Sequence, residues 1–69
     1  MNPEEYQNRL ARVLAGLQDH LSAETAQRFV EKITHDVRLF GDADEWVIEE
    51  RVLWKLEEKL DRLIEEEMT

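Results

Sequence analysis

The chain has 69 residues, no cysteine and a formal net charge of −8, so it can form neither a disulfide nor a thiolate metal site. The negative charge disfavours binding to nucleic acid phosphates or to anionic lipid, because both depend on clustered Lys and Arg. A chain this short holds a single domain, residues 1–69, whose core supplies only about 3–5 kcal/mol of net stability unless a partner subunit adds to it.

The first predicted helix covers about residues 3–20. Asn2 can accept a hydrogen bond as the N-cap, and Pro3 suits the first helical position because the backbone N–H it lacks would be unpaired there. Apolar side chains recur at offsets that keep them on one face of a helix, which predicts a core-facing side. These side chains are Tyr6, Leu10, Val13, Leu14, Leu17 and Leu21.

The second predicted helix covers about residues 23–40. Ser22 can cap it, and the short connection to the first helix requires a tight turn, so the two helices should form an antiparallel hairpin. Gly41 can end the helix in the left-handed conformation that glycine adopts without strain. One face carries the apolar residues Ala26, Phe29, Val30, Ile33, Val37 and Phe40.

The third predicted helix, about residues 43–67, is the longest. Asp42 and Glu45 have the spacing of a capping box, and no glycine or proline follows them. About 25 residues would span roughly 37 Å, which exceeds the roughly 27 Å of the other two helices. The sequence therefore predicts an all-α fold, in which an antiparallel helical hairpin is joined to a long C-terminal helix in a small three-helix bundle.

A leucine seam runs along this third helix. Its leucines alternate steps of three and four residues, which is the spacing of a coiled-coil seam and also of a helix that faces the core of a bundle. The seam could be used up within the bundle, or its overhanging part could pair with a second copy. Because the chain is short, we expect dimerisation through this helix. The seam consists of Trp46, Leu53, Leu56, Leu60, Leu63 and Ile64, and Met68 is a further candidate.

Two apolar residues of the third helix, Val47 and Trp54, fall on the side opposite the seam, one heptad apart. An apolar centre with a charged rim is the general composition of a protein-binding hot spot. The pair could instead cover the side of the bundle or pack in a dimer. The predicted partner-binding set comprises Val47 and Trp54 as anchor, Leu39 and Ile48 as its extension, and Glu50, Arg51, Glu58 and Asp61 as the rim.

Negative charge is concentrated in the same helix. Residues 43–69 contain ten acids and four bases, a net of −6 out of the total of −8. The segment IEEEMT places three glutamates against the negative end of the helix dipole, which favours fraying of the last turn. This segment is either a solvated tail or an acidic contact for a basic groove.

No candidate for catalysis or for metal binding emerges. His20 and His35 should lie roughly 20 Å apart along the predicted hairpin, too far to share a metal. Ser22, the chain's only serine, serves better as a helix cap than as a nucleophile, because no base is placed to activate it. A chain of this length can hardly enclose a cleft that shifts carboxylate pKa values. We expect no enzyme activity, no cofactor and no metal.

Three classes of function remain. The favoured one is a protein-binding module, a stoichiometric inhibitor, anti-activator or adaptor that occupies a surface of a larger regulatory protein or machine. The others are an acidic mimic of nucleic acid and a structural subunit that assembles with itself. The segment MNPEEYQNRL lacks the basic and apolar regions of a signal peptide, and no apolar run approaches the roughly 18 residues that cross a bilayer. We expect a cytoplasmic protein that contacts neither membrane nor nucleic acid directly.

Overall fold

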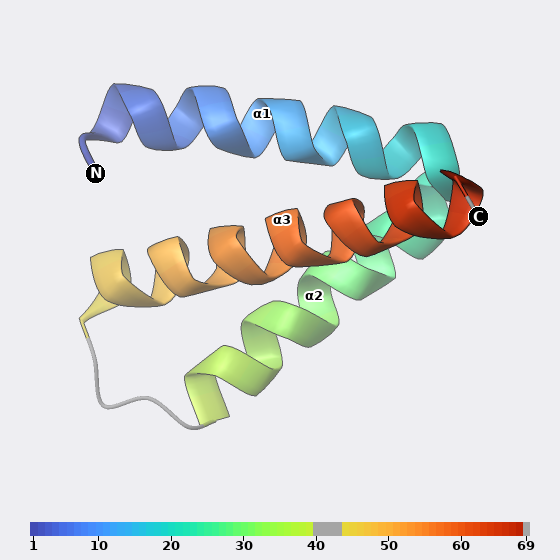
Figure 1. The fold of residues 1–69 in the computed structure, drawn as a ribbon. Helices are drawn as coiled ribbons and strands as arrows, with labels where there is room; N and C mark the ends of the chain where they lie inside the picture. Colours follow the sequence, from blue (N-terminus) through green and yellow to red (C-terminus); the bar gives the residue numbers. More distant parts are fainter. Residues whose placement is uncertain (40–43, 69) are drawn as a thin grey trace.

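The computed structural model describes residues 1–39 and 44–68 (Figure 1). This part of the chain forms three helices and no strand: α1 (Pro3–His20), α2 (Ala23–Leu39) and α3 (Glu45–Met68). The predicted all-α fold with a long third helix is therefore confirmed. The roles predicted for Phe40 in the core, Gly41 as a helix cap and Asp42 in a capping box lie outside the described residues.

Each helix begins at a side chain that accepts a hydrogen bond from the first turn. Asn2 Oδ1 accepts from the Glu5 amide at 2.7 Å, and Ser22 Oγ accepts from the Thr25 amide at 3.1 Å. At α3 the acceptor is Asp44, whose Oδ1 lies 3.0 Å from the Val47 amide nitrogen. The predicted start near residue 43 was thus too early, because Asp44 provides the cap and Glu45 is the first helical residue.

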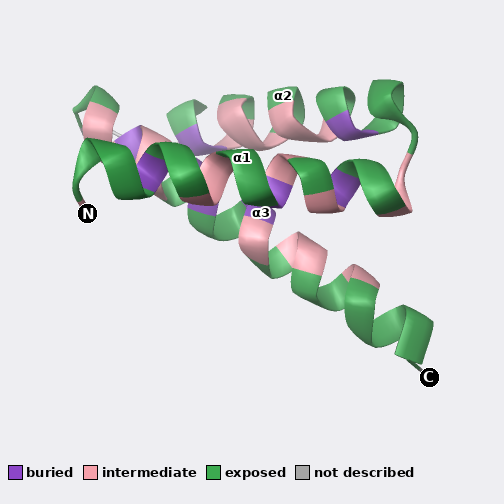
Figure 2. Cartoon of the chain, turned by 90° about the horizontal axis from the view of Figure 1, so that it is seen from above, coloured by how far each residue is buried: buried purple, intermediate pink, exposed green. Residues whose placement is uncertain are grey.

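The helices are arranged so that α3 packs against both of the others (Figures 1 and 2). α1 and α2 run in opposite directions and diverge from their connection at Leu21 and Ser22, and the first half of α3 fills the opening between them. Figure 2 shows α1 from above, with α3 crossing beneath it at an angle. The C-terminal half of α3 therefore extends away from α2. The second half of α3 therefore has fewer neighbours than the first, and Figure 2 shows it as mostly exposed.

The core lies where all three helices meet. Leu17, Leu53 and Leu56 are completely buried, and the side chains of α3 that reach the core form two rows rather than the one predicted. The second row, Ile48, Val52 and Leu56, has a spacing of four residues and exists because α3 contacts two helices at once. The buried set is Tyr6, Val13, Leu17, Ala26, Val37, Ile48, Val52, Leu53 and Leu56. Among the described helices, none has the length and apolar character needed to cross a membrane.

Tyr6 packs edge-on against Trp46, with ring centroids 5.2 Å apart, at the end of the core where α1 and α3 begin. Burial raises the pKa of the Tyr6 hydroxyl above its ordinary value of 10.0, and the negative charge of Glu49 raises it further. The folded state therefore holds the phenolic proton more tightly than the unfolded state does. The corresponding stability is fully present below about pH 10 and is lost as the pH rises through the raised pKa of the folded state.

We therefore expect Tyr6→Phe to reduce the loss of stability at alkaline pH. Urea unfolding at about pH 8 and about pH 11 should show a larger decrease in unfolding free energy for the wild type than for the variant. Tyr6 is the chain's only tyrosine, so the absorbance of the phenolate follows its ionisation directly. An equal decrease in both proteins would show that Tyr6 ionisation is not coupled to unfolding.

The contact between α1 and α3 combines a forked ion pair with a close approach of the helices. Arg9 donates from Nε at 3.0 Å and from Nη2 at 2.5 Å to the two carboxylate oxygens of Glu57. Farther along, His20 Nδ1 lies 2.6 Å from Glu67 Oε1, which ties the end of α1 to the last turn of α3. The fraying predicted for this acidic turn is not seen, because α3 continues through Met68 and Glu67 has a partner on another helix.

Gly16 permits the close approach between these two contacts. A Cβ atom placed at Gly16 would lie 2.7 Å from Leu60 Cδ2 and 3.2 Å from Leu60 Cδ1. Separations this short require Leu60 to move, and a large side chain would push the helices apart. The helix interior therefore holds a glycine despite the roughly 1 kcal/mol of helix propensity that alanine would add.

We expect Gly16→Leu to lower the unfolding free energy by about 1–3 kcal/mol, measured by urea denaturation, because α1 and α3 cannot then approach as closely. Gly16→Ala should stay within about 1 kcal/mol of wild type, since its gain in propensity offsets the displacement of the Leu60 methyl groups. Ala15→Leu is the matched control, because Ala15 is exposed on the neighbouring position of α1. Equal effects of the two leucine substitutions would contradict the close-approach role of Gly16.

Candidate partner-binding surface

Val47 and Trp54 lie on the side of α3 that turns away from the core. Trp54 is 52% exposed, whereas the core residue Leu53, its neighbour in the chain, is completely buried. Val47 lies one heptad earlier and is partly buried. Because residues seven apart nearly superpose along a helix, the two side chains form one apolar strip, here called the Trp54 row. The Val47 end of this row lies at the start of α3, where the Asp44 carboxylate accepts a hydrogen bond from the Val47 N–H.

The structure does not bring the two predicted extensions of this anchor together with it. Ile48 is only 7% exposed and belongs to the core, so its assignment to the exposed surface was wrong. Ile48 belongs to a buried row of α3 with Val52 and Leu56, in which successive residues are four apart. The burial of Val52 was not predicted from the sequence. Leu39 is 65% exposed but is the last residue of α2, on a different helix from the Trp54 row.

Charged side chains surround the Trp54 row unevenly. Glu58 is paired with Arg62 on the same helix at 2.8 Å, and Arg51 is exposed on the same flank. Toward α1 lies a row of three acids, Glu50, Glu57 and Asp61, here called the carboxylate row. Within it, only Glu57 has a cation, Arg9, while Glu50 and Asp61 form no hydrogen bond or ion pair with any described residue. The charge of Glu50 nevertheless acts on Arg9, and the pKa of Arg9 is raised, chiefly through its hydrogen bonds to Glu57.

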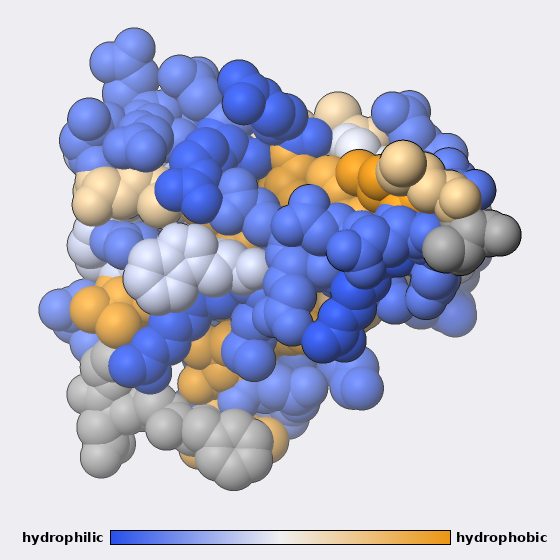
Figure 3. Space-filling view, viewed as in Figure 1, coloured by the Kyte–Doolittle hydropathy of each residue, from blue (hydrophilic) through white to orange (hydrophobic). Residues whose placement is uncertain are grey.

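A shallow hollow of about 340 Å³ separates the carboxylate row from α1. Val13 and Leu60 form its apolar floor, and Arg12 and Asp61 line it from opposite helices. Figure 3 shows an apolar band between α1 and the second half of α3 on this face, bordered by hydrophilic side chains on both sides. Ile64, which is 41% exposed, follows Leu60 by one helical turn on α3.

The seam predicted for dimerisation is largely used inside the bundle. Leu53 and Leu56 are completely buried, and Trp46 packs on Tyr6. Leu60 and Leu63 are partly buried against the core, which leaves Ile64 and the further candidate Met68 as the seam residues with large exposed fractions. The seam residues differ in burial because the first half of α3 lies between α1 and α2, whereas the second half extends past α2.

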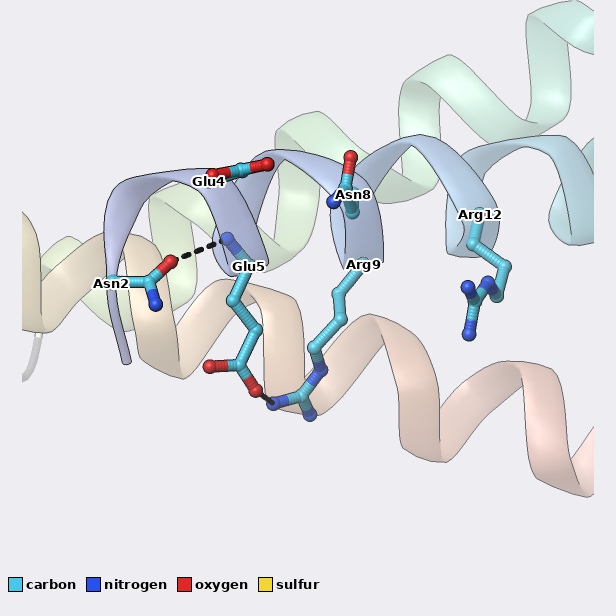
Figure 4. Close-up of a pocket in the computed structure, with 6 residues that line it drawn as sticks. All are labelled: Asn2, Glu4, Glu5, Asn8, Arg9 and Arg12. Carbon is cyan, nitrogen blue, oxygen red and sulfur yellow. Dashed lines mark hydrogen bonds and ion pairs between the residues drawn. The ribbon is translucent and has the colours of Figure 1, made fainter.

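A second hollow, at the start of α1, has a polar lining (Figure 4). The figure shows Asn2 capping the Glu5 amide and the Glu5 carboxylate directed toward Arg9, which lies 3.9 Å away. These groups already serve the helix start and the contact with α3. The residues that line the hollow are Asn2, Glu4, Glu5, Asn8, Arg9 and Arg12.

The described residues contain no group of three or more His, Cys, Asp or Glu side chains arranged to hold a metal ion. His20 is engaged with Glu67, and His35 is exposed on α2. Comparison with protein-family models, with curated proteins and with solved structures finds no match for this chain. Among the described residues, Trp54 is the one aromatic side chain that is largely exposed.

Proposed function

We propose that this protein is a small acidic protein-binding module of the cytoplasm and has no enzyme activity of its own. It acts stoichiometrically, as an inhibitor, anti-activator or adaptor, by covering a surface of a larger regulatory protein or machine. The observation that carries the proposal is the 52% exposure of Trp54 on a helix whose neighbouring residues Val52, Leu53 and Leu56 are buried. Tryptophan is enriched at binding hot spots, because one rigid ring buries a large apolar area.

The surroundings of Trp54 support this proposal. Arg51, Glu58 and Asp61 are exposed around the Trp54 row, and a charged rim of this kind steers encounter and fixes the orientation of a partner. A single exposed apolar residue is ordinary on a protein surface. Trp54 differs in that Val47 continues it along α3 and that two neighbouring carboxylates, Glu50 and Asp61, have no partner among the described residues.

Affinity capture from a lysate of the source cells tests the proposal. Wild type, Trp54→Glu and His35→Glu are compared after circular dichroism has shown equal helicity. His35 is exposed on α2, so its substitution introduces the same acidic side chain away from α3. A protein retained by wild type and His35→Glu but lost by Trp54→Glu supports the proposal. Retention of the same proteins by all three contradicts a binding role for Trp54.

Glu50 and Asp61, which have no partner among the described residues, favour one alternative, in which the acidic side of α3 imitates nucleic acid and blocks a DNA- or RNA-binding protein. The salt dependence of binding distinguishes this alternative from binding through Trp54. Binding to an acidic mimic should weaken steeply as ionic strength rises, whereas binding centred on the Trp54 ring should change little. A purely structural, self-assembling subunit is the remaining alternative, and it predicts that capture retains only further copies of this chain.

We also propose that the chain forms a homodimer through the part of α3 that extends past α2. Leu63 is partly buried there, and it faces the side of α3 opposite Trp54, because it lies nine residues later on a helix that turns by about 100° per residue. Such a dimer leaves the Trp54 row free. We expect sedimentation equilibrium to give a mass that rises from one chain toward two with concentration. A mass of one chain throughout would remove the homodimer while leaving the hetero-partner proposal intact.

A further inference from the structure

Three strips of side chains run along α3, and they follow one another from its exposed side toward its contact with α1. The first is the Trp54 row and the second is the carboxylate row. The third, here called the Leu60 row, consists of Leu60 and Ile64, the latter 41% exposed. At 100° per residue these strips follow one another around the helix, so the acids lie between two apolar borders. A partner that covers both apolar borders must also cover the acids.

Covering the carboxylate row has an electrostatic cost that depends on the partner. Arg9 already neutralises Glu57 and also interacts with the charge of Glu50, but neither Glu50 nor Asp61 forms a hydrogen bond or ion pair with a described residue. Burying these two carboxylates without supplying a cation is strongly unfavourable. A second copy of this chain brings a charge of −8 of its own, and nucleic acid brings phosphates, so both meet repulsion here. A segment that carries lysine or arginine meets attraction.

The flanks of the surface restrict where those cations can lie. Arg51 is exposed on the side of the Trp54 row that is farther from α1, so a cation beyond that row would be repelled. The distance along the helix from Val47 to Ile64 is roughly 25 Å, which corresponds to about 17 residues of a second helix. A partner helix laid along α3 places side chains at the same heptad spacing as the three strips.

We propose that this surface binds a cationic amphipathic helix, whose lysine or arginine side chains meet Glu50 and Asp61 while its aliphatic side chains cover Trp54 and Ile64. The inference rests on the proposed function and names the chemistry of its partner. The complementarity comes from the alternation of apolar and acidic strips, which a uniformly cationic chain or a uniformly apolar helix would not match.

A synthetic helix provides the test. The probe is a leucine–lysine amphipathic peptide of about 18 residues, and its comparison peptide has alanine in place of leucine with the same lysines. Binding is followed by the emission of Trp54 in the Trp46→Phe protein, because Trp46 is the only other tryptophan. Circular dichroism first establishes that this background is folded. We expect a blue shift and saturable binding with the leucine–lysine peptide, and binding at least about tenfold weaker with the alanine–lysine peptide.

Charge variants in the same background locate the binding. Glu50→Gln with Asp61→Asn should weaken binding of the leucine–lysine peptide by about tenfold at low salt. The matched control is Glu24→Gln with Glu31→Gln, which removes the same charge from exposed positions of α2 and should change affinity less than about twofold. Equal losses in the two pairs would show attraction to net charge alone and would overturn the inference.

The remaining outcomes are equally decisive. No saturable binding, or binding without a change in Trp54 emission, overturns the cationic-helix partner. So does a blue shift that appears on concentrating the protein alone, because a second copy would then occupy the surface. If the peptide fails while lysate capture still depends on Trp54, the proposed function stands and only the chemistry assigned to the partner is wrong.

Discussion

Leu56→Asp is expected to abolish cooperative folding at 25 °C. Leu56 is completely buried where α3 lies between the other two helices, so the substitution removes a large apolar side chain and places a carboxylate in its site. Loss of the leucine packing alone costs about 2–5 kcal/mol, and an unpaired buried carboxylate adds several more. A domain of this length has only about 3–5 kcal/mol of net stability, so the combined loss exceeds what the fold can bear.

Far-ultraviolet circular dichroism and urea unfolding measure this effect. The control is Ile64→Asp, eight residues later on the same helix, because Ile64 is 41% exposed and its carboxylate would stay in water. We expect the control to keep its helicity and to lose no more than about 1.5 kcal/mol. A Leu56→Asp protein that unfolds cooperatively with near-native stability would show that Leu56 is not a central core residue. Similar behaviour of the two variants would show that burial along α3 does not change between its halves.

The elements of this fold were predictable because their signals are local. Asn2 with Pro3, and Ser22, mark helix starts through hydrogen bonds that span only three residues, and the apolar faces of α1 and α2 repeat with the helical period. The start of α3 was harder to place because two aspartates, Asp42 and Asp44, both precede it with suitable spacing. Only the observed hydrogen bond from the Val47 amide distinguishes Asp44 as the cap.

The width of the core face of α3 was not predictable from periodicity. A helix that contacts one neighbour buries a narrow strip, and a helix that contacts two buries a wider one. The number of neighbours is a tertiary property, which is why Ile48 was assigned to the surface and Val52 was overlooked. The four-residue spacing from Ile48 through Val52 to Leu56 was present in the sequence and could have suggested a second buried row.

The leucine seam of α3 shows that heptad position alone does not determine how deeply a residue is buried. Leu53 and Leu60 occupy equivalent heptad positions, yet Leu53 is completely buried and Leu60 only partly. The difference arises because α3 crosses α1 and leaves α2, and no local pattern encodes a crossing angle. Gly16 was a usable signal that went unnoticed, because a glycine inside a helix costs about 1 kcal/mol and often marks a close approach. The contact of His20 with Glu67 could be found only from the structure.

The position of Trp54 away from the core could be inferred from its place in the heptad, and its role as a binding anchor stays a prediction. Trp54→Ala is expected to separate binding from folding. Because the ring is 52% exposed and alanine has the higher helix propensity, the unfolding free energy should change by no more than about 1 kcal/mol. Loss of a central aromatic anchor should instead weaken partner binding by at least about 2 kcal/mol, or roughly 30-fold in Kd.

Isothermal calorimetry with the captured partner measures the Kd of each variant, and urea unfolding measures its unfolding free energy. Lys55→Ala is the matched control, because Lys55 is the exposed next residue of α3 and its truncation removes a charge but no aromatic surface. We expect it to change affinity less than about threefold, since exposed ion pairs contribute little. If Trp54→Ala lowers stability by several kcal/mol and leaves affinity unchanged, the ring serves the fold. In that case the exposed side of α3 would lose its apolar anchor, and the acidic strip beside α1 would become the surface to test.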